Sequence, residues 1–227
     1  MPNLSVKHFF NLDHFAHAAL FDGCVFVWEA LKNLASYFDS SSLGRIETDL
    51  PSQVYVVDKE RISIGEGTII EPGAYLQGPC IIGKNCLIRH GAYIRGSIIT
   101  GNDCVIGHDT EVKASILLDG ARAPHFNYVG DSILGNRANL GAGVKCANLR
   151  LDNALITVRL KDQTVSTGLK KLGAIIGDNS ELGCNCVTNP GTILGPQVLC
   201  FPCLNIGGFV PPRSIVKPSQ KSVIENV

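Results

Sequence analysis

Bulky side chains are scarce in this chain. Its 227 residues include one Met, one Trp and 7% aromatic residues, whereas 24 are glycine. A helical bundle needs large interior side chains and loses stability with each helical glycine, so the composition argues against an all-helical fold. It favours a fold with many tight turns and small interior side chains.

Excess charge and long apolar runs are also absent. Twenty Lys and Arg residues balance twenty Asp and Glu residues, whereas a sequence-independent nucleic-acid binder needs a cationic excess. No stretch approaches the ~18 apolar residues of a transmembrane helix. The first residues, MPNLSVKHFF, lack the basic start and apolar run of a signal peptide. We therefore expect a cytoplasmic protein with no nucleic-acid or membrane partner.

Apolar residues recur every six positions, often followed by glycine, with a small residue four positions after each. Such hexads are typical of a parallel β-helix, in which the apolar residue fills the interior and the small residue lets the chain turn a corner. The expected inward positions are Ile64, Ile70, Leu76, Ile82, Ile88, Ile94, Thr100, Ile106, Val112, Leu118, Leu134, Leu140, Ile176, Leu182, Thr188, Leu194, Cys200 and Ile206.

The repeat gives most of the nine cysteines a packing role. An odd count and a missing signal peptide already argue against a disulfide framework. Cys200 and Cys203 form a C-x-x-C that, with Cys184 and Cys186, raises the alternative of a zinc site. The phase points Cys186 and Cys200 inward, away from the other two, so we expect no metal. Five cysteines fall on inward positions: Cys80, Cys86, Cys104, Cys186 and Cys200.

Four further segments surround or break the repeat. Residues 1–61 are expected to form a helical extension, with an amphipathic helix over 21–38 that packs on the coil or on a neighbouring subunit. The β-helix is expected over 62–211, interrupted at about 119–133 and at 149–175. The second interruption alternates like a hairpin. Residues 212–227 form a polar tail that caps the stack.

Stacking converts sequence spacing into geometry. If three hexads make one coil, residues eighteen apart lie on neighbouring coils, about 4.8 Å apart on the same face. Arg95 and Lys113 then form a cationic pair suited to a phosphate or carboxylate. The alternative is two solvated charges. His90 and His108 have the same spacing at a turn, but a histidine metal site of this kind needs a third histidine, so surface roles are favoured.

His125 lies in the first expected interruption, APHFNYVGD. Irregular segments on rigid scaffolds often carry chemistry. A neutral imidazole near pH 7 can act as a general base. The alternative is a structural loop histidine.

The segment HFNYVGDSILGNRANLGAGVKCAN resembles the acetyltransferase domain of the bacterial bifunctional N-acetylglucosamine-1-phosphate uridyltransferases. The following segment, NLRLDN and then TGLKKLGAIIGD, resembles the archaeal sugar-1-phosphate nucleotidylyltransferases with the same acetyltransferase tail. The resemblance covers about residues 60–210. The residues that match the family patterns are Arg95, Lys113, His125, Tyr128, Asn139, Asn148 and Lys171.

The resemblance implies a left-handed coil, a homotrimer with active sites between subunits, and acetyl-CoA as co-substrate. Arg95 and Lys113 would hold the phosphate of an amino-sugar 1-phosphate, and His125 would take the proton from the attacking amine. The backbone of Ala142 would lie near the acetyl group. The sugar would be lined by Tyr128, Asn139, Asn148 and Lys171.

The chain departs from the family in its coenzyme half. Cys184 stands where the bacterial enzymes carry a Ser near the acetyl group. Pro202 lies in C-F-P-C where they repeat G-A-G, and proline has no N–H to donate. Residues 1–61 carry no glycine-rich nucleotide loop and are too short for a nucleotidyltransferase fold, so no such activity is expected from this chain.

These features predict a mainly β chain with a left-handed parallel β-helix and a short N-terminal helical segment. The expected function is an acetyl-CoA-dependent N-acetyltransferase for glucosamine 1-phosphate or a related amino-sugar phosphate, in cell-wall precursor synthesis. One alternative is an acyltransferase for another amino-sugar or sugar-nucleotide acceptor. Another is a non-catalytic subunit that binds a sugar phosphate or a separate nucleotidyltransferase.

Overall fold

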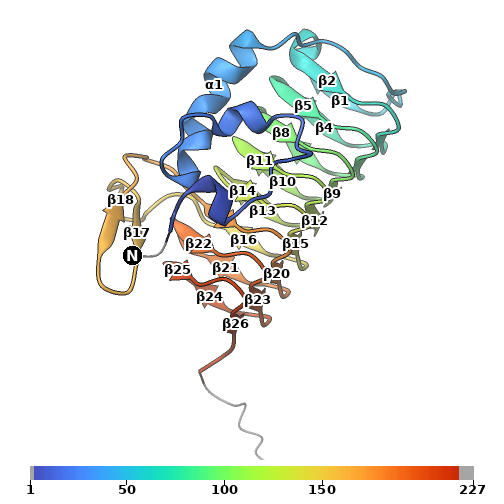
Figure 1. The fold of residues 1–227 in the computed structure, drawn as a ribbon. Coiled ribbons are helices and arrows are strands. Elements are labelled where there is room, and N and C mark those ends of the chain that lie inside the picture. The colour runs from blue at the N-terminus through green and yellow to red at the C-terminus, as the bar shows by residue number, and fades with distance from the viewer. Residues whose placement is uncertain (1–2, 220–227) are drawn as a thin grey trace, which may run out of the picture.

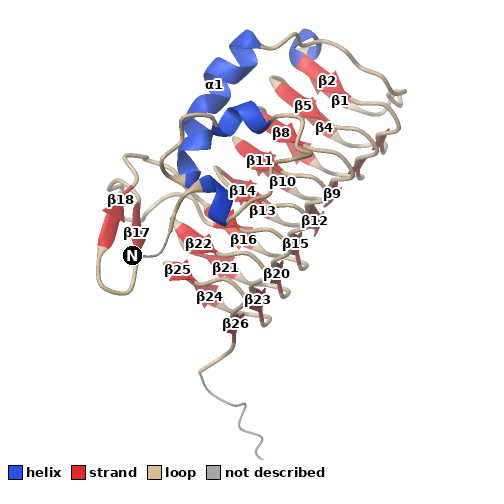
Figure 2. Ribbon diagram, in the orientation of Figure 1, coloured by secondary structure: helices blue, strands red, loops and turns tan. Residues whose placement is uncertain are grey.

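The computed structural model describes residues 3–219 and is mainly β (Figures 1 and 2). The chain winds through three parallel sheets in turn, one strand per sheet in each coil, so that successive coils stack into a solenoid. This is the β-helix that the hexads predict. Each sheet contains eight strands within the described residues, and the sheets are called sheet 1, sheet 2 and sheet 3 below.

The strands of each sheet are short and in register. Sheet 1 contains β1 (Tyr55–Val57), β4 (Tyr75–Gln77), β7 (Tyr93–Ile94), β10 (Glu111–Lys113), β13 (Tyr128–Gly130), β16 (Lys145–Cys146), β21 (Val187–Thr188) and β24 (Asn205–Ile206). Sheet 2 contains β2 (Ile62–Ile64), β5 (Cys80–Ile82), β8 (Ile98–Thr100), β11 (Ser115–Leu117), β14 (Ile133–Leu134), β19 (Ala174–Ile176), β22 (Thr192–Leu194) and β25 (Phe209–Val210). Sheet 3 contains β3 (Ile69–Ile70), β6 (Leu87–Ile88), β9 (Val105–His108), β12 (Arg122–His125), β15 (Asn139–Leu140), β20 (Glu181–Leu182), β23 (Leu199–Cys200) and β26 (Ile215–Val216).

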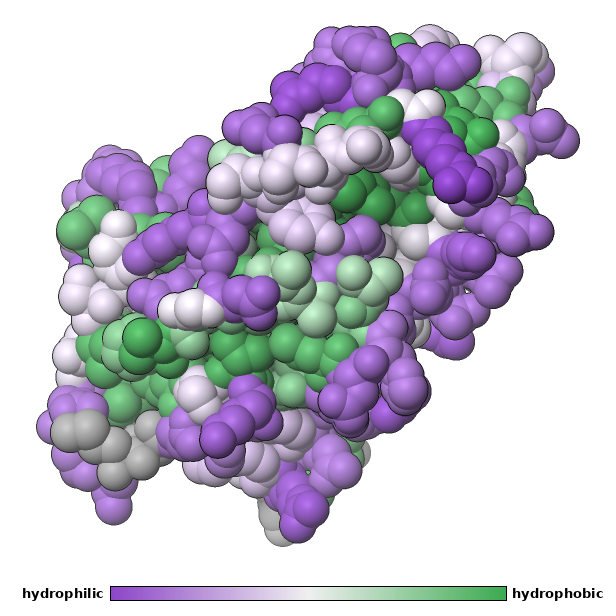
Figure 3. All heavy atoms as spheres, turned by 45° about the horizontal axis from the view of Figure 1, so that its top comes forward, coloured by the Kyte–Doolittle hydropathy of each residue, from purple (hydrophilic) through white to green (hydrophobic). Residues whose placement is uncertain are grey.

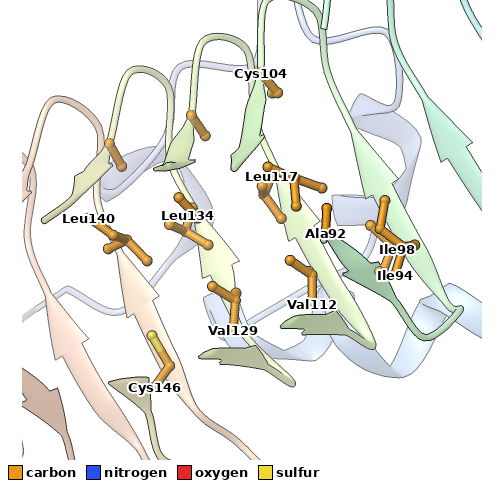
Figure 4. Close-up of a cluster of buried hydrophobic side chains, with 14 of the residues drawn as sticks. Ala92, Ile94, Ile98, Cys104, Val112, Leu117, Val129, Leu134, Leu140 and Cys146 are labelled. Atoms are coloured by element: carbon orange, nitrogen blue, oxygen red, sulfur yellow. The ribbon is translucent and has the colours of Figure 1, made fainter. Parts of the chain in front are cut away.

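Inward side chains from all three sheets fill the solenoid (Figure 4). The hexad residues are buried, and they point into the solenoid as predicted, with one exception. Leu118 packs outside the coil, and Leu117 takes the inward position instead. The reason is a coil that is one residue shorter: Cys80 pairs with Ile98, eighteen residues on, but Ile99 pairs with Ile116, seventeen residues on.

This shortening also changes the interpretation of residues 119–133. They were expected to interrupt the repeat, but they contribute β12 and β13 to regular coils. The break in the hexad phase comes from one missing residue at each of two successive corners, where Ala114 adopts a φ of 43° and Asp131 a φ of 48°, not from an inserted loop. The six-residue pattern could not distinguish the two, because both shift the phase.

The nine cysteines are all free. The five on inward positions are buried, and Cys146 joins them, whereas Cys184 and Cys203 are exposed. Burial raises the pKa of the Cys80 and Cys200 thiols to about 12, as expected of small interior side chains. Across residues 3–219 no cluster of three His, Cys, Asp or Glu side chains is arranged to hold a metal ion.

The N-terminal segment packs on the outer face of sheet 2 (Figure 1). Its helix is shorter than the predicted 21–38: α1 spans Ala30–Ser40. Glu29 accepts hydrogen bonds from the Val25 and Phe26 amides and so fixes a turn before the helix. The 3₁₀ turns are η1 (Val6–His8), η2 (Ala18–Phe21), η3 (Val27–Glu29) and, outside this segment, η4 (Lys59–Arg61).

Outward isoleucines of sheet 2 and apolar residues of the N-terminal segment form a second core. Trp28, Leu34 and Phe38 are buried in it. The amphipathic pattern therefore predicted the buried face of the helix better than its length. The sheet 2 isoleucines in this core are Ile99, Ile116, Ile133, Ile175 and Ile193.

The expected insertion at 149–175 carries an antiparallel hairpin of β17 (Thr157–Arg159) and β18 (Thr164–Ser166). Ile156, Val158 and Leu160 anchor it to the second core. Of the expected tail at 212–227, β26 continues sheet 3, and residues from 220 onward lie outside the described part. No helix in residues 3–219 is long and apolar enough to cross a membrane.

Candidate active site

The outer face of sheet 1 carries an aromatic column. Four of the five tyrosines of the chain lie on it in register. Tyr75 and Tyr93 meet edge to face with ring centroids 5.0 Å apart. Glu111 takes the place between Tyr93 and Tyr128. The face is therefore exposed and rich in polar aromatic side chains.

Arg95 and Lys113 lie on neighbouring coils of this face, and the Arg95 amide donates to the Val112 carbonyl at 3.0 Å. The Arg95 guanidinium donates to Glu111 Oε1 at 2.6 Å and lies 5.8 Å from the centre of the Tyr93 ring. The hydrogen bond to Glu111 raises the pKa of Arg95. This cation is thus oriented and half exposed, with one carboxylate partner.

Lys113 belongs to a denser network at the edge of sheet 1. Its Nζ donates to Asp131 Oδ2 at 2.6 Å, and both side chains are only 17% exposed. The Asn148 amide donates to the same Asp131 oxygen at 2.5 Å and to the Tyr128 hydroxyl at 3.2 Å. We call these four residues the Lys113 network. Hydrogen bonds thus join an ammonium, a carboxylate, an amide and a phenol at the edge of sheet 1.

Gly130 forms the floor below the Lys113 network. A Cβ at this position would lie 2.7 Å from both Asn148 Nδ2 and the Tyr128 hydroxyl oxygen. Any other residue would push these groups apart. The glycine of the H-x-x-Y-x-G-D pattern therefore has a steric role that the sequence alone did not reveal.

His125 ends β12 at the corner between sheets 3 and 1. It is exposed, lies in register with His108, and its carbonyl accepts from the Gly143 amide at 3.0 Å. Its ring forms no hydrogen bond within residues 3–219. His90 and His108 stack on the same corner, with ring centroids 5.9 Å apart.

Ala142 and Cys184 follow on later coils of this corner. The Ala142 carbonyl accepts from the Asn185 amide at 2.8 Å, and the Cys184 carbonyl accepts from the Cys203 amide at 2.8 Å. The corner therefore brings together the expected base and the two residues expected near the acetyl group.

Asn139 lies elsewhere. It pairs with Arg122 and Glu181 on the outer face of sheet 3. There it lines an open groove of about 650 Å³ that also includes Asp119 and Arg137. One chain therefore does not place Asn139 beside the Lys113 network.

Lys171 is exposed and directly precedes Leu172, whose amide donates to the Asn148 carbonyl at 3.0 Å. The end of the insertion, where the chain re-enters the solenoid, therefore places Lys171 at the edge of the Lys113 network.

Sequence reasoning missed Glu111 and Asp131, the two carboxylates that neutralise the cationic pair. Their signal was available: each lies within a few residues of a site residue and on the same face.

Comparison with known proteins supports this assignment of the repeats. The family model described as bacterial transferase hexapeptide (six repeats) matches residues 61–96. The bifunctional sugar-1-phosphate nucleotidylyltransferase/acetyltransferase of Sulfurisphaera tokodaii is 38% identical over 86 residues, which cover 38% of this chain and 21% of that protein. The bifunctional protein GlmU of Methanococcus maripaludis is 36% identical over 108 residues, covering 48% of this chain and 26% of that protein.

The similarity thus spans about a quarter of the length of these curated relatives. Among solved structures, an Arabidopsis UDP-N-acetylglucosamine acyltransferase covers 75% of this chain and 68% of its own, with a TM-score of 0.41 and 11% identity. The chain therefore carries hexapeptide transferase repeats and is similar to GlmU-type proteins over up to about half of its length.

Proposed function

We propose that this chain is an acetyl-CoA-dependent N-acetyltransferase for glucosamine 1-phosphate or a related amino-sugar phosphate, in the synthesis of UDP-N-acetylglucosamine and cell-wall precursors. The observation that carries the proposal is the Lys113 network beside Arg95 on one open face. The name of the Sulfurisphaera tokodaii relative, a bifunctional sugar-1-phosphate nucleotidylyltransferase/acetyltransferase, supports it.

In this proposal the two cations bind the phosphate, and the Tyr128 hydroxyl and Asn148 amide bind sugar hydroxyls. The His125 imidazole takes the proton of the amine as its nitrogen attacks the thioester carbon of acetyl-CoA. The C–S bond then breaks, and the CoA sulfur leaves as the thiolate. The backbone near Ala142 donates to the developing oxyanion. Alignment, one base and oxyanion donors are sufficient for this reaction.

We propose that the site is completed in a homotrimer. The second core covers sheet 2, so sheets 1 and 3 with their shared corner are the open faces. His125 and Asn139 lie on the corner and on sheet 3, whereas the Lys113 network lies on sheet 1. A contact between the corner of one copy and sheet 1 of the next would unite these residues. Size-exclusion chromatography with light scattering tests this state.

Release of CoA in the presence of glucosamine 1-phosphate tests the reaction. His125→Ala is expected to remain folded and to lose turnover by about a hundredfold or more, the usual contribution of a general base. His108→Ala is the matched control, because His108 occupies the same corner one coil earlier and is expected to leave the rate unchanged. Absence of CoA release across a panel of amino-sugar phosphates and sugar nucleotides would refute the proposed activity.

The corner between sheets 3 and 1, where the coenzyme is proposed to bind, favours one alternative. Pro202 follows Cys184 in the stack and offers no amide hydrogen. A non-catalytic subunit that binds a sugar phosphate and a separate cytoplasmic nucleotidyltransferase would not need this donor. Calorimetry with acetyl-CoA separates the two cases, because only the enzyme is expected to bind it.

A further inference from the structure

A second polar groove lies between the hairpin and the last coils of the solenoid. It encloses about 270 Å³ and is lined by Arg150, Thr157, Arg159, Thr164 and Asn189 and by the turn at 207–208. A wider hollow of about 610 Å³ continues from it past Arg159 and Lys161. We call the two together the hairpin groove. None of the residues that line it has a role in the reaction proposed above.

The insertion that lines this groove carries an excess of positive charge. Residues 149–175 contain five basic and two acidic residues, a net charge of +3 in a chain whose overall formal charge is zero. Arg150 is held by both oxygens of Asp152, at 2.9 and 2.5 Å. Arg159 is exposed, and its guanidinium has no hydrogen-bonded partner in the described part of the chain. One oriented and one free guanidinium therefore line a small concave surface.

Two glycines line the floor of the hairpin groove, and at both a side chain would crowd a neighbouring group. Gly208 has a φ of 75°, and a Cβ there would lie 2.9 Å from the Arg159 carbonyl oxygen. A Cβ on Gly207 would lie 3.1 Å from Asn189 Nδ2. Neither glycine amide donates a hydrogen bond within residues 3–219. Successive backbone amides without partners are donors that anions use.

The hairpin groove lies close to the Lys113 network. The Ala147 amide donates to the Thr188 carbonyl at 3.0 Å, so Asn189 lies on the coil after Asn148, about 4.8 Å further along the stack. Both sites open at the corner between sheets 1 and 2. A ligand with several phosphates can therefore reach from one to the other.

We propose that the hairpin groove binds the diphosphate of a nucleoside diphosphate group. Guanidinium forks, hydroxyls and free amides match phosphate oxygens. Two co-substrates carry this group: CoA, through its 3′-phosphoadenosine diphosphate, and a nucleotide-linked amino sugar, through its nucleotide. The assignment to a co-substrate rests on the proposed function, whereas anion binding by the groove does not.

Equilibrium calorimetry with the full chain tests this inference without turnover. The probes are inorganic pyrophosphate, CoA and UDP. Arg150→Gln and Arg159→Gln are each expected to weaken pyrophosphate binding about tenfold, the usual effect of removing a hydrogen bond between charged groups. Arg45→Gln is the matched control: its side chain is 80% exposed at the far end of the solenoid, and its removal is expected to leave affinity unchanged.

The measurements with CoA and with UDP identify which co-substrate carries the diphosphate that the groove binds. Loss of CoA affinity alone assigns the groove to the acyl donor, and loss of UDP affinity alone assigns it to a nucleotide-linked acceptor. Equal affinity of both groove variants and the parent for all three probes would overturn the inference, as would equal weakening by Arg45→Gln. Because no acceptor is turned over, these outcomes are independent of the CoA-release result that tests the proposed function.

Discussion

Glu111 is predicted to oppose phosphate binding, and its removal is expected to strengthen it. Its carboxylate lies 2.6 Å from the Arg95 guanidinium, so the cation that would hold the phosphate is already neutralised. Glu111→Gln leaves an amide of the same shape. The variant keeps a hydrogen-bond acceptor for Arg95 but lacks the negative charge beside the incoming phosphate.

The size of the effect follows from Coulomb's law. A phosphate charge held by Arg95 would lie about 6 Å from the Glu111 carboxylate, where like charges repel by about 0.7 kcal/mol in water and about 2.8 kcal/mol near a low-dielectric surface. The Glu111 side chain is 32% exposed and that of Arg95 43%, so solvent screening gives a repulsion between these two limits, about 1–2 kcal/mol. The expected change is a KM lower by about 5–30-fold.

Steady-state CoA release measures this change with glucosamine 1-phosphate and with glucosamine as acceptors. The gain is expected for the phosphorylated acceptor alone and to shrink as ionic strength rises. Asp131→Asn is a contrasting variant. It removes the partner of Lys113 from a site where both side chains are only 17% exposed, so it is expected to cost folding stability as well, about 3 kcal/mol.

Arg95→Gln decides the interpretation. If Glu111→Gln and Arg95→Gln both raised the KM for the phosphorylated acceptor, Glu111 would act by orienting Arg95 and the electrostatic reasoning would be refuted. An equal gain with unphosphorylated glucosamine would also refute it.

Three further predictions concern stability. Gly107→Ala is expected to lower the free energy of unfolding by about 3 kcal/mol or more in thermal unfolding, because a Cβ there would lie 1.8 Å from the Pro124 carbonyl oxygen. A fully stable variant would contradict the close stacking of these two coils. Ile133→Ala is expected to cost about 3 kcal/mol in urea titrations, although its side chain points away from the coil interior, because the second core buries it fully; a loss typical of a surface site would show that the N-terminal segment does not pack there. Burial raises the pKa of Asp178, whose carboxylate accepts a hydrogen bond from the Asn11 amide at 2.8 Å. Above the reference pKa of 3.8 the folded state therefore binds more protons than the unfolded state. The free energy of unfolding then falls as the pH rises from this reference value through the raised pKa of the folded state. Relative to Asp178→Asn, the unfolding free energy of the parent is therefore expected to decline between about pH 3 and pH 7, and a relative increase in urea titrations would contradict it.

Periodicity predicted the fold well because one physical constraint repeats. Each coil must bury a residue from each sheet, so six-residue spacing appears directly in the sequence. Leu118 shows where this reasoning fails. It is as apolar as the inward Leu117 and lies in the original phase, but the second core buries it from outside. Sequence patterns record that a residue is buried, not which of two cores buries it.

The spacing predicted the cations of the candidate site, and it also contained the position of one carboxylate partner that the sequence reasoning missed. Spacing placed Arg95 and Lys113 on one face, because register in a solenoid follows from residue number. Asp131 lies eighteen residues after Lys113, so the same spacing indicates it, although the residue that pairs with Lys113 in the shorter coil is Gly130. Asn139 lies on another sheet, and in the proposed trimer it would come from a neighbouring copy, which no pattern within one chain indicates.

The missing residue near Ala114 has a consequence for the Lys113 network. In a coil of eighteen residues, Asp131 would pair with Lys113 on the outer face, and Gly130 would pair with Val112 and leave a hole in the interior. In the shorter coil Gly130 pairs with Lys113 and Val129 pairs with Val112. The valine fills the core, and the glycine opens the floor on which Tyr128 and Asn148 meet. One of the two shortenings that disturb the hexad phase therefore creates the glycine floor of the Lys113 network.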